Sequence, residues 1–240
     1  MTESPLTPRY KEEIKRNIEE IRENIARAAA QAGRSQEEVQ LMAVTKTVHP
    51  DAVNCAWENG IDLFGENRVQ EYASKASFYR FGPEKIHFIG TLQSNKAGQL
   101  IGRVSCVESV NSLKLAAELN KRAAELAAPL DILLEINIGS EANKTGLNPT
   151  EMNAFLDNMG RFKNLCLRGL MCIPPFDASE YETERYFDQM AKLFVDIKDK
   201  KSDNINVNIL SMGMTGDYAL AVRHGSTLVR IGTGIFGRRN

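Results

Sequence analysis

Short apolar runs alternate with longer amphipathic segments along most of the chain. The runs are rich in valine, isoleucine and leucine and end near glycine, proline or asparagine, which is typical of parallel strands that are covered on both faces. They predict strands at residues 41–45, 61–64, 86–89, 104–107, 130–138, 165–171, 207–210 and 227–231. The intervening segments predict helices at residues 51–59, 67–77, 94–100, 112–126, 149–158, 180–198 and 217–223.

One more helix is predicted in front of the first strand. Thr7 and Pro8 suit the N-cap and the first helical position, and Gly33 can end the helix. Its apolar residues recur with the spacing of a single helical face, and they are Ile14, Ile18, Ile21 and Ile25.

Eight strand–helix units within roughly 200 residues fit a (β/α)8 TIM barrel of the α/β class. No linker or low-complexity segment divides the 240 residues. We therefore expect a flexible N-terminus over residues 1–9 and a single barrel domain over residues 10–240. An open, doubly wound sheet is the alternative architecture for the same alternation.

Composition excludes several classes of function. The net charge is −1 with acidic and basic residues interspersed, so neither a nucleic-acid surface nor a polybasic membrane patch is expected. No apolar run approaches the ~20 residues needed to span a bilayer, and the first residues lack an apolar signal core. The four cysteines form no CxxC pair and the three histidines are far apart. These features predict a cytoplasmic protein with free thiols and without a metal site.

Lys46 is the first candidate for chemistry. It follows the apolar run 41–45, and His49-Pro50 breaks the chain soon afterwards. In α/β proteins the carboxyl ends of the strands carry the ligand site. A lysine buried there lowers its pKa readily, which suits it to Schiff-base formation. The alternative is a lysine that only extends from a strand end into solvent.

Two glycine-rich loops follow the last two predicted strands, at residues 211–217 and 232–234. Barrels often bind phosphate at the loops after strands seven and eight. Glycines allow backbone N–H groups to approach an anion, and the hydroxyls of Ser211, Thr215 and Thr233 add donors. The alternative is that these glycines only form tight turns.

Arg230 lies on the last predicted strand, on the face opposite Val229 and Ile231. Because the two apolar side chains should pack against helices, Arg230 should point into the barrel mouth. A buried guanidinium needs an acceptor. An ion pair with Glu135 and a contact with a ligand are both open.

Several blocks of the sequence resemble the pyridoxal phosphate homeostasis protein family, which comprises barrels related to the N-terminal domain of alanine racemase. The resemblance extends from about residue 10 to 237 and keeps the order and spacing of the family's motifs. The blocks are AVTK at 43–46, FGEN at 64–67, HFIG and LQSNK within 87–96, GLM at 169–171, SMGM at 211–214 and VRIGT at 229–233.

The resemblance implies a fold-type III barrel that binds pyridoxal 5'-phosphate (PLP). Lys46 would form the Schiff base and Arg230 would face the pyridine nitrogen. The other cofactor-binding positions that it implies are Asn67, Ser211, Thr215, Gly232 and Thr233. Thr215 stands where a serine is usual in the family and keeps the hydroxyl, and Cys172 stands where a small or hydroxyl residue is common.

The resemblance also bears on catalysis. An arginine beside the pyridine nitrogen should keep that nitrogen unprotonated, because two facing cations repel, and this weakens the electron sink. Related racemases take a second acid/base from a C-terminal β-domain and a partner subunit, whereas this chain stops after the eighth strand and none of its tyrosines stands out as catalytic. No catalytic residue is therefore assigned.

We expect a monomeric PLP carrier and regulator of vitamin B6 and amino-acid homeostasis without robust turnover. Its expected partners are PLP, amino acids and PLP-dependent apo-enzymes. A fold-type III enzyme acting on a small amino acid is the main alternative. A barrel aldolase that binds a sugar phosphate and uses Lys46 is a weaker one.

Overall fold

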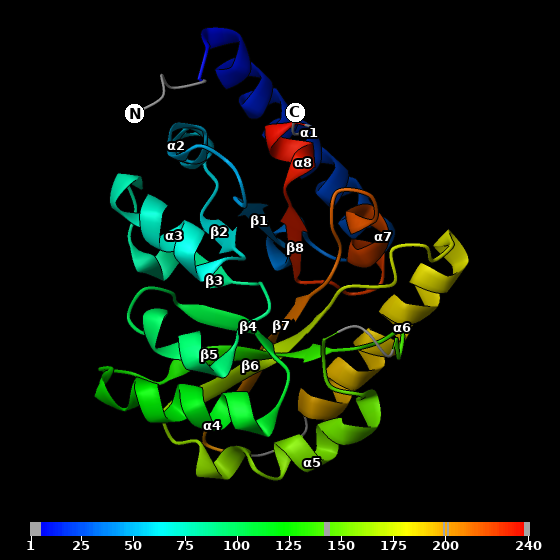
Figure 1. Ribbon diagram of the computed structural model, residues 1–240. Helices are drawn as coiled ribbons and strands as arrows, with labels where there is room; N and C mark the ends of the chain where they lie inside the picture. Colours follow the sequence, from blue (N-terminus) through cyan, green and yellow to red (C-terminus); the bar gives the residue numbers. More distant parts are fainter. Residues whose placement is uncertain (1–5, 142–144, 199, 201, 238–240) are drawn as a thin grey trace.

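The computed structural model contains a closed barrel of eight parallel strands, in which each strand pairs with the next and β8 pairs with β1 (Figure 1). The structure describes residues 6–141, 145–198, 200 and 202–237. The strands are β1 (Gln40–Val44), β2 (Leu63–Glu66), β3 (Ile86–Phe88), β4 (Cys106–Val110), β5 (Leu130–Ile136), β6 (Leu165–Cys172), β7 (Ile205–Ser211) and β8 (Leu228–Ile231). The predicted barrel is therefore confirmed, and the open sheet is excluded.

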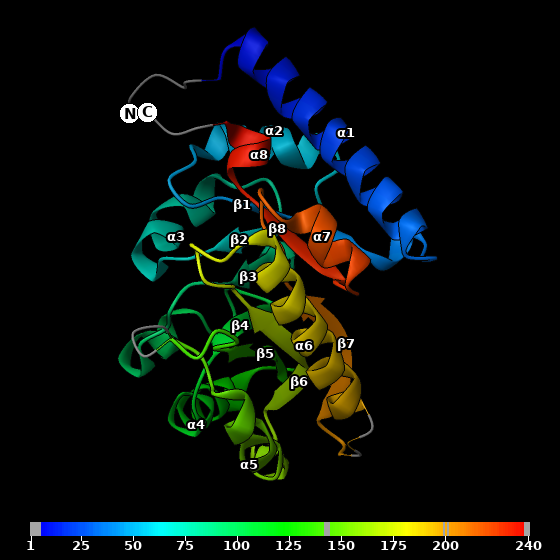
Figure 2. The ribbon, with the colours of Figure 1, turned by 90° about the vertical axis from the view of Figure 1, so that its right-hand side faces the viewer.

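Helices follow the strands and cover the outside of the barrel (Figures 1 and 2). They are α1 (Pro8–Gln31), α2 (Pro50–Glu58), α3 (Val69–Lys75), α4 (Leu113–Arg122), α5 (Met152–Leu156), α6 (Glu180–Lys198), α7 (Tyr218–Arg223) and α8 (Thr233–Phe236). After β3 the connection is a 3-10 helix, Ser94–Gln99. Among the helices that the described residues form, none combines the length and apolarity needed to cross a membrane.

The predicted additional helix is α1, which lies along the outside of α7 and α8 (Figure 2). Thr7 caps it by accepting a hydrogen bond from the Tyr10 N–H at 3.2 Å, and the predicted isoleucine stripe is buried. The Tyr10 hydroxyl donates to the carbonyl of Phe236 at 2.9 Å, which ties α1 to the last helix. The predicted flexible segment 1–9 lies partly outside the described residues, and α1 already begins at Pro8.

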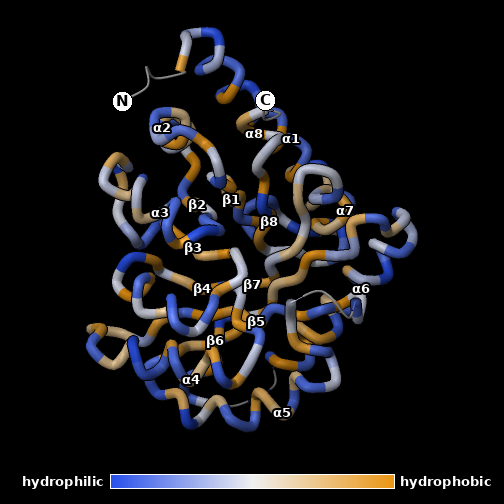
Figure 3. The backbone as a smooth tube through the Cα atoms, viewed as in Figure 1, coloured by the Kyte–Doolittle hydropathy of each residue, from blue (hydrophilic) through white to orange (hydrophobic). Residues whose placement is uncertain are grey.

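Strand residues divide between a large core outside the sheet and small clusters inside the barrel, as the alternation predicts. Val229 and Ile231 pack in the large core between the sheet and the helices. Leu228 belongs instead to a small cluster inside the barrel, together with Met42 and Leu63. Hydrophobic residues recur along the strands at the centre of the molecule, whereas hydrophilic residues are frequent on the surrounding helices (Figure 3). Arg230 shares the inward face of β8 with Leu228, so it points toward the barrel mouth.

Two strands lie further along the chain than predicted. β2 spans Leu63–Glu66 rather than residues 61–64, and β4 spans Cys106–Val110 rather than residues 104–107. Each strand thereby includes a glutamate, Glu66 or Glu108, that is completely buried. This shift brings Glu108 into the barrel interior.

Candidate functional site

A cavity of about 610 Å³ lies at the carboxyl ends of the strands. It contains six of the seven residues that the sequence predicts for a cofactor site, and these are Lys46, Asn67, Thr215, Arg230, Gly232 and Thr233. Ser211 is not among the residues that line it. The barrel therefore gathers residues from four different strand ends into one concave site, as is usual for this fold.

Lys46 lies in the turn directly after β1, and its side chain is half-buried at the cavity. The preceding residue is fixed to the neighbouring strand, because both the N–H and the hydroxyl of Thr45 donate to the carbonyl of Gly65, at 3.0 and 3.1 Å. A lysine placed in this way presents a single primary amine to a ligand in the cavity, as the strand position predicts.

The glycine-rich loops after β7 and β8 meet on one side of the cavity. The hydroxyl of Thr233 donates to that of Thr215 at 3.2 Å, and the Gly234 N–H donates to the same Thr215 oxygen at 3.2 Å. Gly216 and Gly232 line the cavity between them. Both threonines are exposed to the cavity. Hydroxyls and glycine amides that converge in this manner can hold an anion.

Arg230 is only 3% exposed, and its guanidinium is held inside the barrel. Nη1 donates to the Ser211 hydroxyl at 2.7 Å, and Nη2 donates to the carbonyl of Cys172 at 2.8 Å. The Ser211 hydroxyl donates in turn to Glu108 Oε2 at 2.6 Å, and Glu108 Oε1 lies 2.6 Å from His87 Nδ1. We call His87, Glu108, Ser211 and Arg230 the polar floor of the cavity.

The polar floor contains a buried carboxylate, Glu108, and a buried guanidinium, Arg230, which are joined through the Ser211 hydroxyl. Burial by itself would raise the pKa of Glu108. The hydrogen bond and charge of His87, the charge of Arg230 and the Ser211 hydrogen bond instead hold that pKa below its ordinary value. Glu108 is therefore an anion that compensates the buried guanidinium of Arg230.

Glu135 is not the partner that holds Arg230. Its Oε1 accepts a hydrogen bond from the Thr145 hydroxyl at 2.6 Å, and its Oε2 is buried without a hydrogen-bond partner among the described residues. Burial raises the pKa of Glu135, while Thr145 and the charge of Arg230 lower it by less. Of the two alternatives, the ion pair with Glu135 does not form, and Glu135 instead offers a carboxyl group to the cavity.

The placement of Ser211 differs from the sequence expectation of a phosphate contact. Its side chain is completely buried on the inward face of β7, and its hydroxyl already donates to Glu108 and accepts from Arg230. His87 appeared only within a family motif, and Glu108 was missed. The inward alternation of Cys106 and Glu108 is the signal that could have found it.

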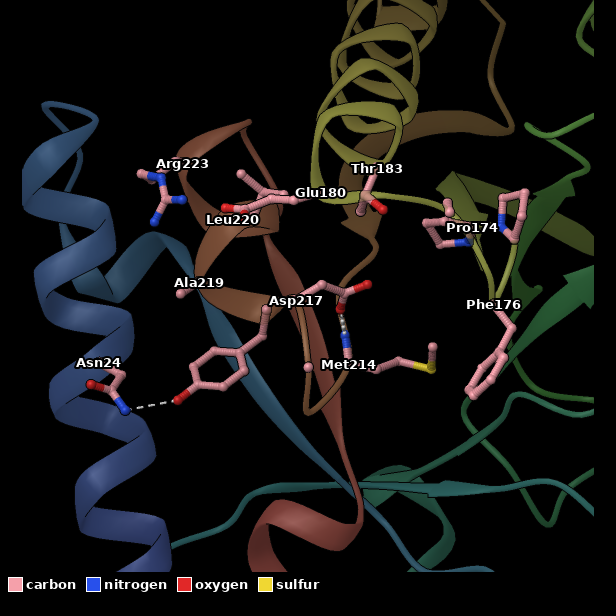
Figure 4. A pocket seen from close by; sticks show the side chains of 14 residues that line it. Asn24, Pro174, Phe176, Glu180, Thr183, Met214, Asp217, Ala219, Leu220 and Arg223 are labelled. Atoms are coloured by element: carbon pink, nitrogen blue, oxygen red, sulfur yellow. Dashed lines mark hydrogen bonds between the residues drawn. The ribbon is translucent and has the colours of Figure 1, made fainter.

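A second cavity of about 730 Å³, drawn in Figure 4, shares Met214 and Gly216 with the first. It lies between the start of α6, α7 and α1, where Asn24 donates to the Tyr218 hydroxyl at 2.9 Å. It has no lysine and none of the residues predicted to bind a cofactor. The first cavity is therefore the candidate site. Among the residues that the structure describes, no cluster of three or more His, Cys, Asp or Glu is placed to hold a metal ion.

Comparison with known proteins identifies relatives that match nearly the whole chain. The family model for the alanine racemase N-terminal domain matches residues 17–240. A pyridoxal phosphate homeostasis protein of Pasteurella multocida is 39% identical over 229 residues, covering 95% of this chain and 98% of that protein. The protein of the same name from Escherichia coli is 38% identical over 232 residues, covering 95% and 97%.

Solved structures agree with this relationship. PipY of Synechococcus elongatus, solved with PLP bound, is 32% identical with a TM-score of 0.74, covering 89% of this chain and 100% of that chain. The alanine racemase of Corynebacterium glutamicum is 14% identical with a TM-score of 0.68, and this chain covers 62% of it, so that likeness shows the fold alone. The sequence and structure comparisons together place the chain in the pyridoxal phosphate homeostasis protein family.

Proposed function

We propose that this chain binds PLP in the cavity at the carboxyl end of the barrel and serves vitamin B6 and amino-acid homeostasis. The observation that carries the proposal is the presence of Lys46 in one cavity with the Thr215–Thr233 hydroxyls and Arg230. PLP has an aldehyde, a phosphate and a pyridine ring, and these three features match an amine, a set of anion donors and a fixed guanidinium.

Two further observations support the fit. Asn67 Oδ1 is buried at the cavity without a hydrogen-bond partner among the described residues, so it can accept a hydrogen bond from a ligand. The cavity volume of about 610 Å³ is within the range of small-molecule sites, roughly 300–1,000 Å³. When bound, PLP supplies an aldehyde that a lysine amine can capture reversibly.

The protein's own residues divide the work of binding. Lys46 would form the covalent bond to the aldehyde, and Thr215, Thr233 and the amides of Gly216 and Gly232 would hold the phosphate. Arg230 would hold the ring-nitrogen side of the cofactor, where its charge would disfavour protonation of that nitrogen. The polar floor keeps Arg230 in place, because the Ser211 hydroxyl accepts from the guanidinium and is itself fixed by donating to Glu108. Ser211 thus acts on the cofactor through Arg230.

The family takes its name from homeostasis rather than from an enzyme activity. We propose further that the chain has no robust racemase, transaminase or decarboxylase turnover. In this proposal it is a cytosolic monomer that exchanges PLP with apo-enzymes and senses amino acids. Sedimentation analysis of the purified protein tests the monomer, and activation of a PLP-dependent apo-enzyme by the loaded protein tests the transfer.

One observation favours the alternative of an enzyme acting on a small amino acid. Glu135 places a carboxyl with a raised pKa and an unpartnered oxygen in the cavity, and a group of that kind can move protons. Exchange of Cα protons with solvent, measured over a panel of amino acids, separates the two functions. Turnover at about 1 s⁻¹ or more that is lost in Glu135→Gln would establish the enzyme.

Covalent binding is tested by absorbance and by borohydride reduction. The loaded protein should show a visible absorption band, which an aldolase without PLP would lack, and reduction should attach the cofactor to Lys46. Lys46→Ala should lose the trapped adduct while retaining some non-covalent PLP. If the adduct maps to Lys96, or to Lys144, which lies outside the described residues, the assignment of Lys46 is wrong.

A further inference from the structure

The turn that carries Lys46 is held on both sides by one pair of side chains from α3. Lys75 Nζ donates to the carbonyl of Thr45 at 3.0 Å, and Glu71 Oε1 accepts from the Thr47 N–H at 2.5 Å. Lys75 and Glu71 also form an ion pair with each other across one turn of α3. A single ion pair thus contacts the residue before Lys46 and the residue after it.

Thr47 adopts a backbone conformation that is unfavourable for threonine. Its φ is +59°, in the left-handed region, where a β-branched residue is a genuine outlier. Such strain persists only where surrounding contacts determine the conformation, and it occurs often at functional sites. The hydrogen bond from the Thr47 N–H to Glu71 is a contact of this kind, and it lies directly beside Lys46.

The geometry sets this pair apart from an ordinary helical ion pair. Pairs of this spacing at the surface contribute little to stability, and the Arg122–Glu118 pair on α4 is an example, with side chains 53% and 26% exposed. Lys75 and Glu71 are 12% and 18% exposed, and each also binds a backbone group. Burial alone would raise the pKa of Glu71, but Lys75 and the Thr47 N–H lower it below its ordinary value, so Glu71 is an anion at neutral pH.

We infer that the Glu71–Lys75 pair is a clamp that positions Lys46 for covalent capture of an aldehyde. It holds the strained turn so that the amine meets the cavity, and it contributes nothing to recognition of the phosphate or the ring. The inference rests on the proposed function, because it assigns the geometry of the amine to residues outside the cofactor contacts. Glu71 and Lys75 are therefore positioning residues.

The test compares Glu71→Gln and Lys75→Met with Glu118→Gln, which breaks the matched ion pair on α4. Stopped-flow absorbance gives the rate of adduct formation after PLP is added to protein freed of cofactor. Pyridoxine 5'-phosphate lacks the aldehyde and reports non-covalent recognition alone. We expect the clamp variants to form the adduct about ten-fold more slowly, since a relaxed turn misplaces the amine. Their affinity for pyridoxine 5'-phosphate should stay within about two-fold of the wild type, and Glu118→Gln should change neither.

A second-site change distinguishes positioning from general loss of structure. Asparagine accepts the left-handed region more readily than threonine, so adding Thr47→Asn to Glu71→Gln should restore much of the rate of adduct formation. A pair that only stabilised α3 would not respond to residue 47. The clamp is refuted if Glu71→Gln forms the adduct as fast as the wild type, or if it weakens pyridoxine 5'-phosphate binding by the factor that it slows capture. If wild-type protein forms no adduct at Lys46, the proposed function fails as well.

Discussion

Removal of the Ser211 hydroxyl should destabilise the protein rather than abolish phosphate recognition. Ser211 is completely buried, donates to the Glu108 carboxylate at 2.6 Å and accepts from the Arg230 guanidinium at 2.7 Å. Hydrogen bonds to charged groups each contribute about 1.5–3 kcal/mol. In this variant Glu108 would keep its hydrogen bond with His87, and Arg230 would keep its hydrogen bond to the Cys172 carbonyl. We therefore expect Ser211→Ala to lower the free energy of unfolding by about 3 kcal/mol rather than by the full sum.

The assay is urea and thermal unfolding of the cofactor-free protein, followed by titration with PLP and with pyridoxal. About 3 kcal/mol corresponds to a fall in melting temperature of roughly 6–12 °C for a domain of this size. Ser226→Ala is the matched control, because the Ser226 hydroxyl is equally buried but has uncharged acceptors within reach, of which the Met212 carbonyl is nearest at 2.8 Å. It should cost about 1 kcal/mol. If Ser211→Ala instead leaves unfolding unchanged and lowers the affinity for PLP but not for pyridoxal, then Ser211 binds the phosphate directly and does not act through Arg230.

Three further outcomes are expected. Thr215→Val should lower the affinity for PLP about ten- to a hundred-fold through loss of a charge-assisted hydrogen bond. The affinity for pyridoxal, measured in parallel titrations, should stay unchanged. Burial raises the pKa of Glu66, so the contribution of this carboxyl to stability is complete below the ordinary pKa of 4.5 and is lost as the pH rises through the raised pKa. The stability of Glu66→Gln relative to the wild type should therefore increase as the pH rises over this range, as measured by urea midpoints. Gly90→Ala would place a Cβ 2.0 Å from the carbonyl oxygen of Asn67, and should lower both the melting temperature and PLP affinity.

The alternation of strands and helices was predictable because it depends on local patterns. The apolar runs, the helix-ending glycines and the isoleucine stripe of α1 specify eight strand–helix units and an additional helix. The prediction of α6 at residues 180–198 agrees with Glu180–Lys198, since a long amphipathic segment between breakers admits few other structures. The same patterns indicate which face of β8 carries Arg230.

The strand ends that pass through charged residues were not predictable in this way. The predicted strands stopped short of both glutamates, because a glycine ends the apolar run before Glu66 and because charged residues such as Glu108 are rarely buried. Each glutamate is bound by residues that are distant along the chain. Glu66 Oε1 accepts from the Tyr79 hydroxyl at 2.5 Å, although its Oε2 has no hydrogen-bond partner among the described residues. Glu108 is bound by both His87 and Ser211. No local sequence pattern predicts a hydrogen bond to a residue that is distant along the chain. The sequence therefore did not predict that the four residues of the polar floor form one hydrogen-bonded network.

The two hydroxyls predicted together, Ser211 and Thr215, are separated by the path of the chain after β7. Ser211 still belongs to the strand and points inward, whereas Gly213 turns the chain with φ of +94°, a conformation that favours glycine. A Cβ at Gly213 would also lie 2.6 Å from that of Ala221. The turn carries Thr215 up to the cavity and to Thr233. One hydroxyl thus supports Arg230 from below and the other faces the ligand. Ser211→Ala and Thr215→Val should accordingly separate stability from phosphate affinity, even though only three residues lie between them in the sequence.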